Sequence, residues 1–311
     1  MTNYQSQLGG LREAKSTSRR LRCVFVFASL ALLVHTVGCF GERVPTDEKE
    51  LVDAIFKAAK YESAARVQAL IEGGAPTNQP DLLGWTPLHY AVNRLHYADF
   101  KEFDLIEVVA AAPDTEIDAI DNSGLSPVFL AAQHGSPEVL DILERHGALL
   151  ARKDDHGFTL LMTAVVHRQP SMVAHLVGKG VDIDARLPSG GTALFIAIRS
   201  QSSDMVSTLI ELGAGVRGND QANEPVIFAA ALPNEDIVGL LIKAGADVNA
   251  VNQKTGLTPL HRAVTSGPEM ITLLVKSGAK AGVPDKNGDT PLDFAEKLED
   301  EDSIRLLREA R

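Results

Sequence analysis

Alanine returns along this chain at an almost constant interval, and this interval constrains the fold more than any other feature. The steps between eight alanines are 33, 40, 33, 33, 32, 34 and 32 residues, and an aliphatic residue precedes each alanine by three positions. These alanines are Ala58, Ala91, Ala131, Ala164, Ala197, Ala229, Ala263 and Ala295. A period near 33 residues predicts a stack of similar units, each too small to bury a core alone.

Local signals divide each unit into two helices. The residue five positions before the alanine is in most units a good helix N-cap, and proline often follows it at the first helical position. These expected starts are Asp53, Thr86, Ser126, Thr159, Thr192, Glu224, Thr258 and Thr290. Glycine is expected to end a second, apolar helix at Gly74, Gly147, Gly180, Gly213, Gly245 and Gly278.

The units resemble ankyrin repeats. The clearest copies are GWTPLHYAV at Gly84–Val92 and GLTPLHRAV at Gly256–Val264, with GADVNA at Gly245–Ala250 as the matching tail. The resemblance covers about residues 45–311. It implies an all-α ankyrin-repeat solenoid of about eight helix-turn-helix units joined by β-turn or hairpin loops, which acts as a non-enzymatic protein-binding scaffold.

The one long step, of 40 residues, locates an insertion around Asn93–Asp104. The same unit has Pro113-Asp114 in place of its final glycine. Tyr97, Phe100 and Phe103 have the spacing of one helical face, so we expect this face to fold onto the repeats. A protruding second contact site is the alternative.

The N-terminus has the pattern of an export signal. Three arginines, at positions 19, 20 and 22, precede the apolar run Cys23–Val34. A run of twelve residues suits a signal peptide and is short for a spanning helix, which needs about 20 apolar residues. Val37-Gly38-Cys39 then resembles a bacterial lipobox, although Thr36 stands where leucine is usual. This resemblance implies that Cys39 is lipidated and becomes the first mature residue.

These features predict three segments: a signal peptide at 1–38, a tether at 39–49 that starts with Cys39, and an ankyrin-repeat domain at 50–311. We expect an exported lipoprotein of the cell envelope or periplasm, held at a membrane through the lipid on Cys39. An ordinary cleaved signal, which would give a secreted protein, and an uncleaved anchor are the alternatives.

The repeats are acidic. Residues 1–38 hold five basic residues and one acid, which leaves 25 basic and 40 acidic residues and a charge of −15 for the remainder. This balance disfavours nucleic acid, whose phosphates require a basic surface, and is compatible with a basic protein partner. A general contribution to solubility is the simpler interpretation.

A row of apolar residues is the candidate binding site. In ankyrin families the residue before the Thr of each first helix lies on the concave, partner-facing side. Here Trp85, Leu125 and Phe158 occupy this position in three consecutive units. Further candidates, beside them or at groove-facing positions of the first helices, are Leu82, Leu83, Asn93, Arg94, Gln133, His134 and His167. Packing of these side chains within the repeats is the alternative interpretation.

Residues 213–218, GAGVRG, formally match the dinucleotide-binding pattern GxGxxG. That pattern needs a strand before it and a helix after it, whereas here a helix is expected before it and a turn after it, so we interpret it as a helix stop. The sequence has no P-loop, no HExxH motif and no nucleophile elbow. His134 and His167 fall at one equivalent position of adjacent units, whose separation of about 8–10 Å is too large for both to ligate one zinc ion. We therefore expect no enzyme, no cofactor and no metal site. Two other classes stay open: a hydrolase or metal-dependent enzyme with a site built on the groove, and a purely structural envelope spacer.

Overall fold

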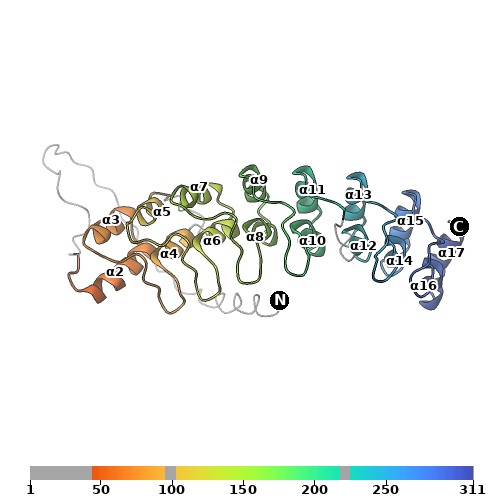
Figure 1. Cartoon of the computed structure of the whole chain (residues 1–311), viewed down its shortest axis with the longest axis horizontal. Coiled ribbons are helices and arrows are strands. Elements are labelled where there is room, and N and C mark those ends of the chain that lie inside the picture. Colours follow the sequence, from red (N-terminus) through yellow and green to blue (C-terminus); the bar gives the residue numbers. More distant parts are fainter. Residues whose placement is uncertain (1–43, 95–102, 218–224, 311) are drawn as a thin grey trace, which may run out of the picture. The chain divides into compact units, whose positions relative to one another are not determined.

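The computed structural model describes residues 44–94, 103–217 and 225–310, which belong to one compact unit, Val44–Arg311. Each repeat contributes a first and a second helix that pack against each other, and each helix also packs against its counterparts in the neighbouring repeats. In Figure 1 the first helices form the lower row and the second helices the upper row. For the residues that the structure describes, the prediction of an all-α solenoid of helix-turn-helix units is confirmed.

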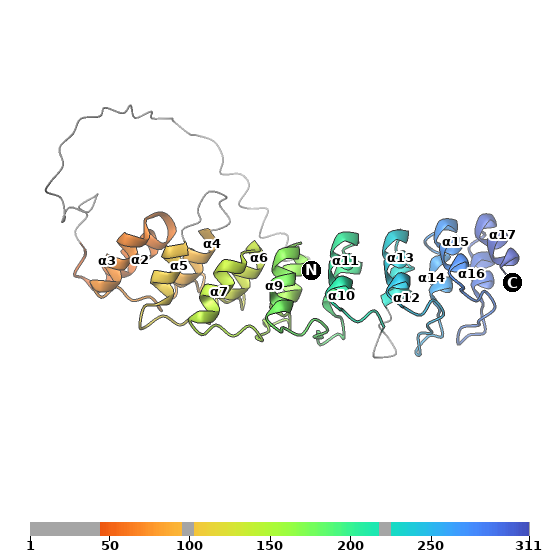
Figure 2. The same cartoon turned by 90° about the horizontal axis from the view of Figure 1, so that it is seen from above.

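The first helices are α2 (Glu48–Tyr61), α4 (Pro87–Asn93), α6 (Pro127–His134), α8 (Leu160–Val166), α10 (Ala193–Arg199), α12 (Pro225–Ala229), α14 (Pro259–Ala263) and α16 (Pro291–Lys297). The second helices are α3 (Ala64–Glu72), α5 (Phe103–Ala110), α7 (Pro137–Arg145), α9 (Pro170–Gly178), α11 (Ser203–Glu211), α13 (Glu235–Lys243), α15 (Pro268–Lys276) and α17 (Glu301–Glu309). The loops that join one described repeat to the next lie along the lower edge of Figure 2.

The recurring alanines form the contact between neighbouring first helices. Every one of the eight is at most 2% exposed, and the aliphatic residues three positions earlier are at most 5% exposed. A methyl side chain permits close approach of two helix backbones, and the aliphatic residue then fills the space between the two rows. The period seen in the sequence is therefore the period of the core.

The helix ends follow the predicted local signals with one exception. The predicted Thr and Ser residues at 86, 126, 159, 192, 258 and 290 are N-caps with extended backbone. The six predicted glycines that follow second helices have φ between +82° and +99°, the left-handed region that favours glycine. Glu224 lies outside the described residues.

The exception is the first repeat, where the prediction of a start at Asp53 is wrong. Asp53 lies inside α2, and Asp47 is the N-cap, since its Oδ1 accepts hydrogen bonds from the Lys49 and Glu50 amides at 3.0 and 3.3 Å. No proline or Thr interrupts the segment between Asp47 and Asp53, so the helix extends toward the N-terminus. Regular structure thus begins at Glu48, two residues before the expected domain boundary.

The insertion is described only at its C-terminal end. Phe103 begins α5 and packs against the core, as expected, whereas Tyr97 and Phe100 lie outside the described residues. The unusual end of this repeat also has a role. Asp114 accepts hydrogen bonds from the Thr77 amide at 2.9 Å and the Thr77 hydroxyl at 2.8 Å, which joins the loop before α4 to the loop after α5.

The predicted signal peptide and residues 39–43 of the tether, which include Cys39, also lie outside the described residues. Within the described part of the chain, no helix is long and apolar enough to cross a membrane.

Candidate functional site

A tight hairpin precedes most first helices and positions the candidate binding row. In the hairpin before α4, the Asp81 amide donates to the Trp85 carbonyl at 2.9 Å, and Asp81 Oδ1 accepts from the Leu83 and Trp85 amides at 2.8 and 3.0 Å. The side chain thus satisfies the main-chain donors of the turn. The hairpins that begin at Asp121, Asp154 and Asp285 repeat this pattern.

Adjacent hairpins are joined through their backbones. The Asn122 amide donates to the Leu83 carbonyl at 3.0 Å, and the Asn122 side chain donates to the Leu82 carbonyl at 2.9 Å. Near the other end of the stack the Lys286 amide donates to the Thr255 carbonyl at 3.1 Å. These bonds hold successive hairpin tips in a fixed register, so side chains at equivalent positions form rows.

A buried histidine links each of two first helices to the following hairpin. The Thr86 amide donates to His89 Nδ1 at 3.1 Å, so Nε2 carries the proton and donates to the Leu125 carbonyl at 3.1 Å. His261 makes the same two bonds, to Thr258 at 3.0 Å and to the Asp289 carbonyl at 3.1 Å. Burial lowers the pKa of both imidazoles below the usual range, which favours this neutral form.

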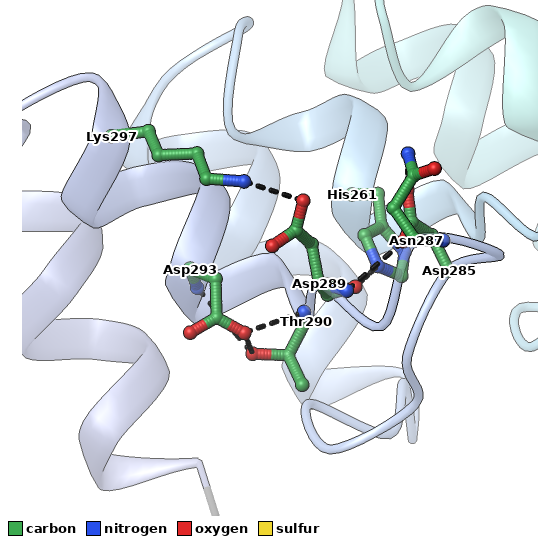
Figure 3. Close-up of polar contacts among 7 residues, drawn as sticks. All are labelled: His261, Asp285, Asn287, Asp289, Thr290, Asp293 and Lys297. Carbon is green, nitrogen blue, oxygen red and sulfur yellow. Dashed lines mark hydrogen bonds and ion pairs between the residues drawn. The ribbon is translucent and has the colours of Figure 1, made fainter.

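The last repeat replaces this histidine with an aspartate. Figure 3 shows Asp293 beside Thr290, whose amide and hydroxyl donate to Asp293 Oδ2 at 2.7 and 2.6 Å. The same figure shows Asp289, at the position equivalent to Trp85, in an ion pair with Lys297. The row that begins with an indole ring therefore ends with a paired carboxylate.

Trp85 is integrated into its surroundings. Its indole Nε1 donates to Asp121 Oδ2 at 3.0 Å, and its ring lies against Tyr90, with centroids 4.8 Å apart. Tyr90 in turn donates to Asp81 at 2.5 Å and lies under Lys60, whose Nζ is 3.9 Å from the ring centroid. Partial burial would raise the pKa of Asp81, but these hydrogen bonds and Lys60 outweigh it and lower the pKa.

The other members of the row are also half-buried. Trp85, Leu125 and Phe158 all pack against the core and each keeps part of its side chain exposed. Leu82 and Leu83 differ, because they lie at the hairpin tip with 97% and 59% of their surface exposed. The structure thus brings the three row residues onto the helices and leaves the two leucines outside.

The predicted polar candidates mostly connect neighbouring repeats. Arg94 donates to the Glu62 carbonyl at 2.7 Å, at the end of α2. His134 Nε2 lies 3.2 Å from Asn93 Oδ1, and the Gln133 carbonyl accepts a hydrogen bond from the Gln169 side chain at 3.0 Å. These residues lie at the ends of the first helices, and the bonds named here join neighbouring repeats.

His167, the last predicted candidate, is half-buried at the C-cap of α8, where burial lowers its pKa. Sequence reasoning missed Tyr61, which is 77% exposed at the end of α2. The one feature that distinguishes Tyr61 is its position as the last residue of α2. Among the residues that the structure describes, no group of three or more His, Cys, Asp or Glu side chains could hold a metal ion.

The family model for ankyrin repeats matches residues 95–187, 167–252 and 226–311. A two-row helical stack whose hairpins carry variable residues is the architecture of this class, and the chain belongs to the ankyrin-repeat family. Proteins of this fold are typically non-enzymatic interaction scaffolds.

Three comparisons illustrate the likeness. The chain is 31% identical over 217 residues to the mouse B-cell lymphoma 3 protein homolog. The aligned region covers 67% of this chain and 47% of that protein. It is 39% identical over 150 residues to Protein PhlB of Serratia liquefaciens, which covers 48% of this chain and 52% of the relative. The chain thus spans about half the length of these relatives. The crystal structure of the Bcl-3 ankyrin repeat domain has a TM-score of 0.62 and 29% identity, and the match covers 72% of this chain and 99% of that one.

Proposed function

We propose that this protein is an exported, lipid-anchored scaffold of a bacterial cell envelope that binds a protein partner along the row formed by Trp85, Leu125 and Phe158. The observation that carries the proposal is this row itself: three large apolar side chains in consecutive repeats, each held in place by the core and each partly exposed. Fixed aromatic and aliphatic groups lose little conformational entropy on binding and are typical of interaction hot spots.

The location follows from the N-terminal sequence. The basic residues, the apolar run Cys23–Val34 and the lipobox-like Val37-Gly38-Cys39 support export and lipidation of Cys39. A relative from the bacterium Serratia liquefaciens agrees with a bacterial setting. The excess of acidic residues favours a basic partner, which it would attract over a distance of about 8–10 Å at ordinary salt, and disfavours nucleic acid.

Site-specific photocrosslinking tests the binding row. A photoreactive amino acid at 125 or 158 should crosslink in living cells to one and the same protein. Leu257 provides the matched control, because it is the equivalent, half-buried residue of a later repeat. The same crosslink from 257, or none from any position, would count against the row, and the absence of any crosslink would favour a structural spacer.

The purified crosslinked protein then allows a quantitative test. The variants Trp85→Ala, Leu125→Ala and Phe158→Ala should each weaken its binding about tenfold or more, as expected for hot-spot side chains. Leu257→Ala should leave the affinity unchanged, while circular dichroism confirms that all four variants keep their helices.

The lipid anchor has its own test. Cells fed an alkynyl fatty acid should label the wild-type chain but not the Cys39→Ala variant. An unlabelled wild-type chain would contradict lipidation of Cys39 and would not bear on the proposed binding row.

A further inference from the structure

The tip of the first hairpin differs from every other hairpin tip that the structure describes. Leu82 and Leu83 stand between Asp81 and Gly84, whereas the equivalent positions of later hairpins hold polar residues or proline. These later pairs are Asn122-Ser123, Asp155-His156, Pro188-Ser189 and Lys286-Asn287. Only the first tip therefore presents two large apolar side chains to solvent.

The two leucines are held outward by a well-ordered backbone. Both of their carbonyls accept hydrogen bonds from Asn122, and the Leu83 amide donates to Asp81 Oδ1 at 2.8 Å. The core excludes both side chains, although Trp85, two residues later, packs on it. The hairpin thus displays an apolar edge that the stack of repeats does not need for its own stability.

This tip belongs to the first hairpin after the described chain enters the fold at Val44. Val44 packs so closely on Gly73 that a Cβ at Gly73 would lie 2.5 Å from Val44 Cγ1. Gly73 is the C-cap of α3, and seven residues lead from it to Asp81, where the first hairpin begins. Val44 stands five positions after Cys39, which limits their distance to about 18 Å. Each later hairpin is displaced by a further repeat, or about 10 Å per step.

We propose that Leu82 and Leu83 insert into the interfacial region of the bilayer when the chain is held there, and so orient the stack of repeats on the membrane. This inference rests on the lipid anchor proposed for Cys39. Two leucines bury too little surface to hold a protein on a membrane alone, but a short tether raises their effective concentration at the bilayer to the millimolar range. Because the tether already holds the chain at the bilayer, insertion needs only the contact between the two leucines and the lipid.

A single labelled thiol can report this contact. The chain has two cysteines, Cys23 and Cys39, and neither belongs to the described repeats. In the chain from Phe40 to Arg311, a cysteine introduced by Leu83→Cys is therefore unique and can carry the environment-sensitive dye NBD. Ser123→Cys gives the matched control, because Ser123 is exposed at the equivalent position of the next hairpin.

The anchor is supplied chemically, so that the result does not depend on acylation in cells. An N-terminal hexahistidine tag holds each labelled chain on phosphatidylethanolamine–phosphatidylglycerol vesicles that contain a nickel-chelating lipid. A lipid with a nitroxide high on its acyl chain should quench the dye at 83 at least roughly twofold, because interfacial side chains reach about 5–10 Å into the bilayer. The dye at 123 should keep its fluorescence.

Leu82 should be required for this effect. Leu82→Asp in the chain labelled at 83 should abolish the quenching, whereas Leu149→Asp, at a side chain that is 61% exposed in a later repeat, should not. Equal quenching at 83 and 123, or none at either, would overturn the proposal even where Cys39 proves to be lipidated. A blue shift at 83 that appears without vesicles and grows with protein concentration would assign the tip to a second copy of the chain instead.

Discussion

The repeat that begins with α4 and the repeat that begins with α16 share one backbone plan, and two of three matched positions hold different side chains. Trp85 corresponds to Asp289, His89 to Asp293, and Gly84 has the same left-handed backbone as Gly288, with φ of +79° and +91°. The side chains of Trp85 and His89 reach into the next repeat, whereas the side chains of Asp289 and Asp293 bond within their own. Bonds within a repeat can therefore be tested separately from bonds that join it to its neighbour.

The largest expected effect comes from the histidine position. His89→Ala removes the bonds to the Thr86 amide and the Leu125 carbonyl and leaves a cavity, which should lower the free energy of unfolding by about 3 kcal/mol. Asp293→Ala loses only the cap of Thr290 and should cost about 1 kcal/mol. Denaturant unfolding, with hydrogen exchange at α4 and α16 to localise the change, measures both.

His89→Asp sharpens this result. If capping alone mattered, this variant would be as stable as the wild type. We expect the free energy of unfolding of His89→Asp to stay well below that of the wild type, because an aspartate cannot supply the proton that Nε2 donates to the Leu125 carbonyl.

The hairpin glycines give a second, smaller contrast. A Cβ at Gly84 would lie 2.6 Å from the Asn122 amide nitrogen, whereas a Cβ at Gly288 would meet open space. Gly288→Ala should therefore cost about 1 kcal/mol, for the left-handed backbone alone. Gly84→Ala should cost about 2 kcal/mol or more, because a backbone atom of the next hairpin must also move. Thermal and denaturant unfolding measure both losses of stability. Equal losses for Gly84→Ala and Gly288→Ala would mean that the first hairpin and the next one move apart at little cost to make room for the methyl group.

Sequence alone predicted the features that recur in most repeats. The caps, the glycine stops and the buried alanines are local signals, and eight copies in phase reinforce one another. Asp53 failed because it stands in phase with the other starts, while the actual cap, Asp47, lies outside the period. The common spacing describes the average repeat, and the first repeat departs from it because its first helix starts earlier.

Side chains that act between repeats were harder to predict. Arg94 donates to a carbonyl 32 residues earlier, a contact that no local pattern encodes, and its predicted role in partner binding stays a prediction. Leu82 and Trp85 are both apolar and three positions apart, but the turn between them directs Trp85 onto Tyr90 and Leu82 into solvent. Only the path of the backbone distinguishes them.

The last expected effect concerns pH. Burial lowers the pKa of His89 and His261 below the ordinary value near 6.5, so both stay neutral in the folded chain while the unfolded chain takes up protons. Stability is then fully present above pH 6.5 and falls as the pH drops from there toward the lowered values. Each histidine can contribute at most about 1.4 kcal/mol per pH unit in this window.

Unfolding midpoints at pH 7 and pH 5 measure this loss. The double variant His89→Gln/His261→Gln should start from a lower stability and lose less between the two pH values than the wild type. His156→Gln, at an exposed hairpin tip, is the control and should follow the wild type. An undiminished loss in the double variant would show that acid acts elsewhere, and that the two histidines join their repeats without making that junction sensitive to pH.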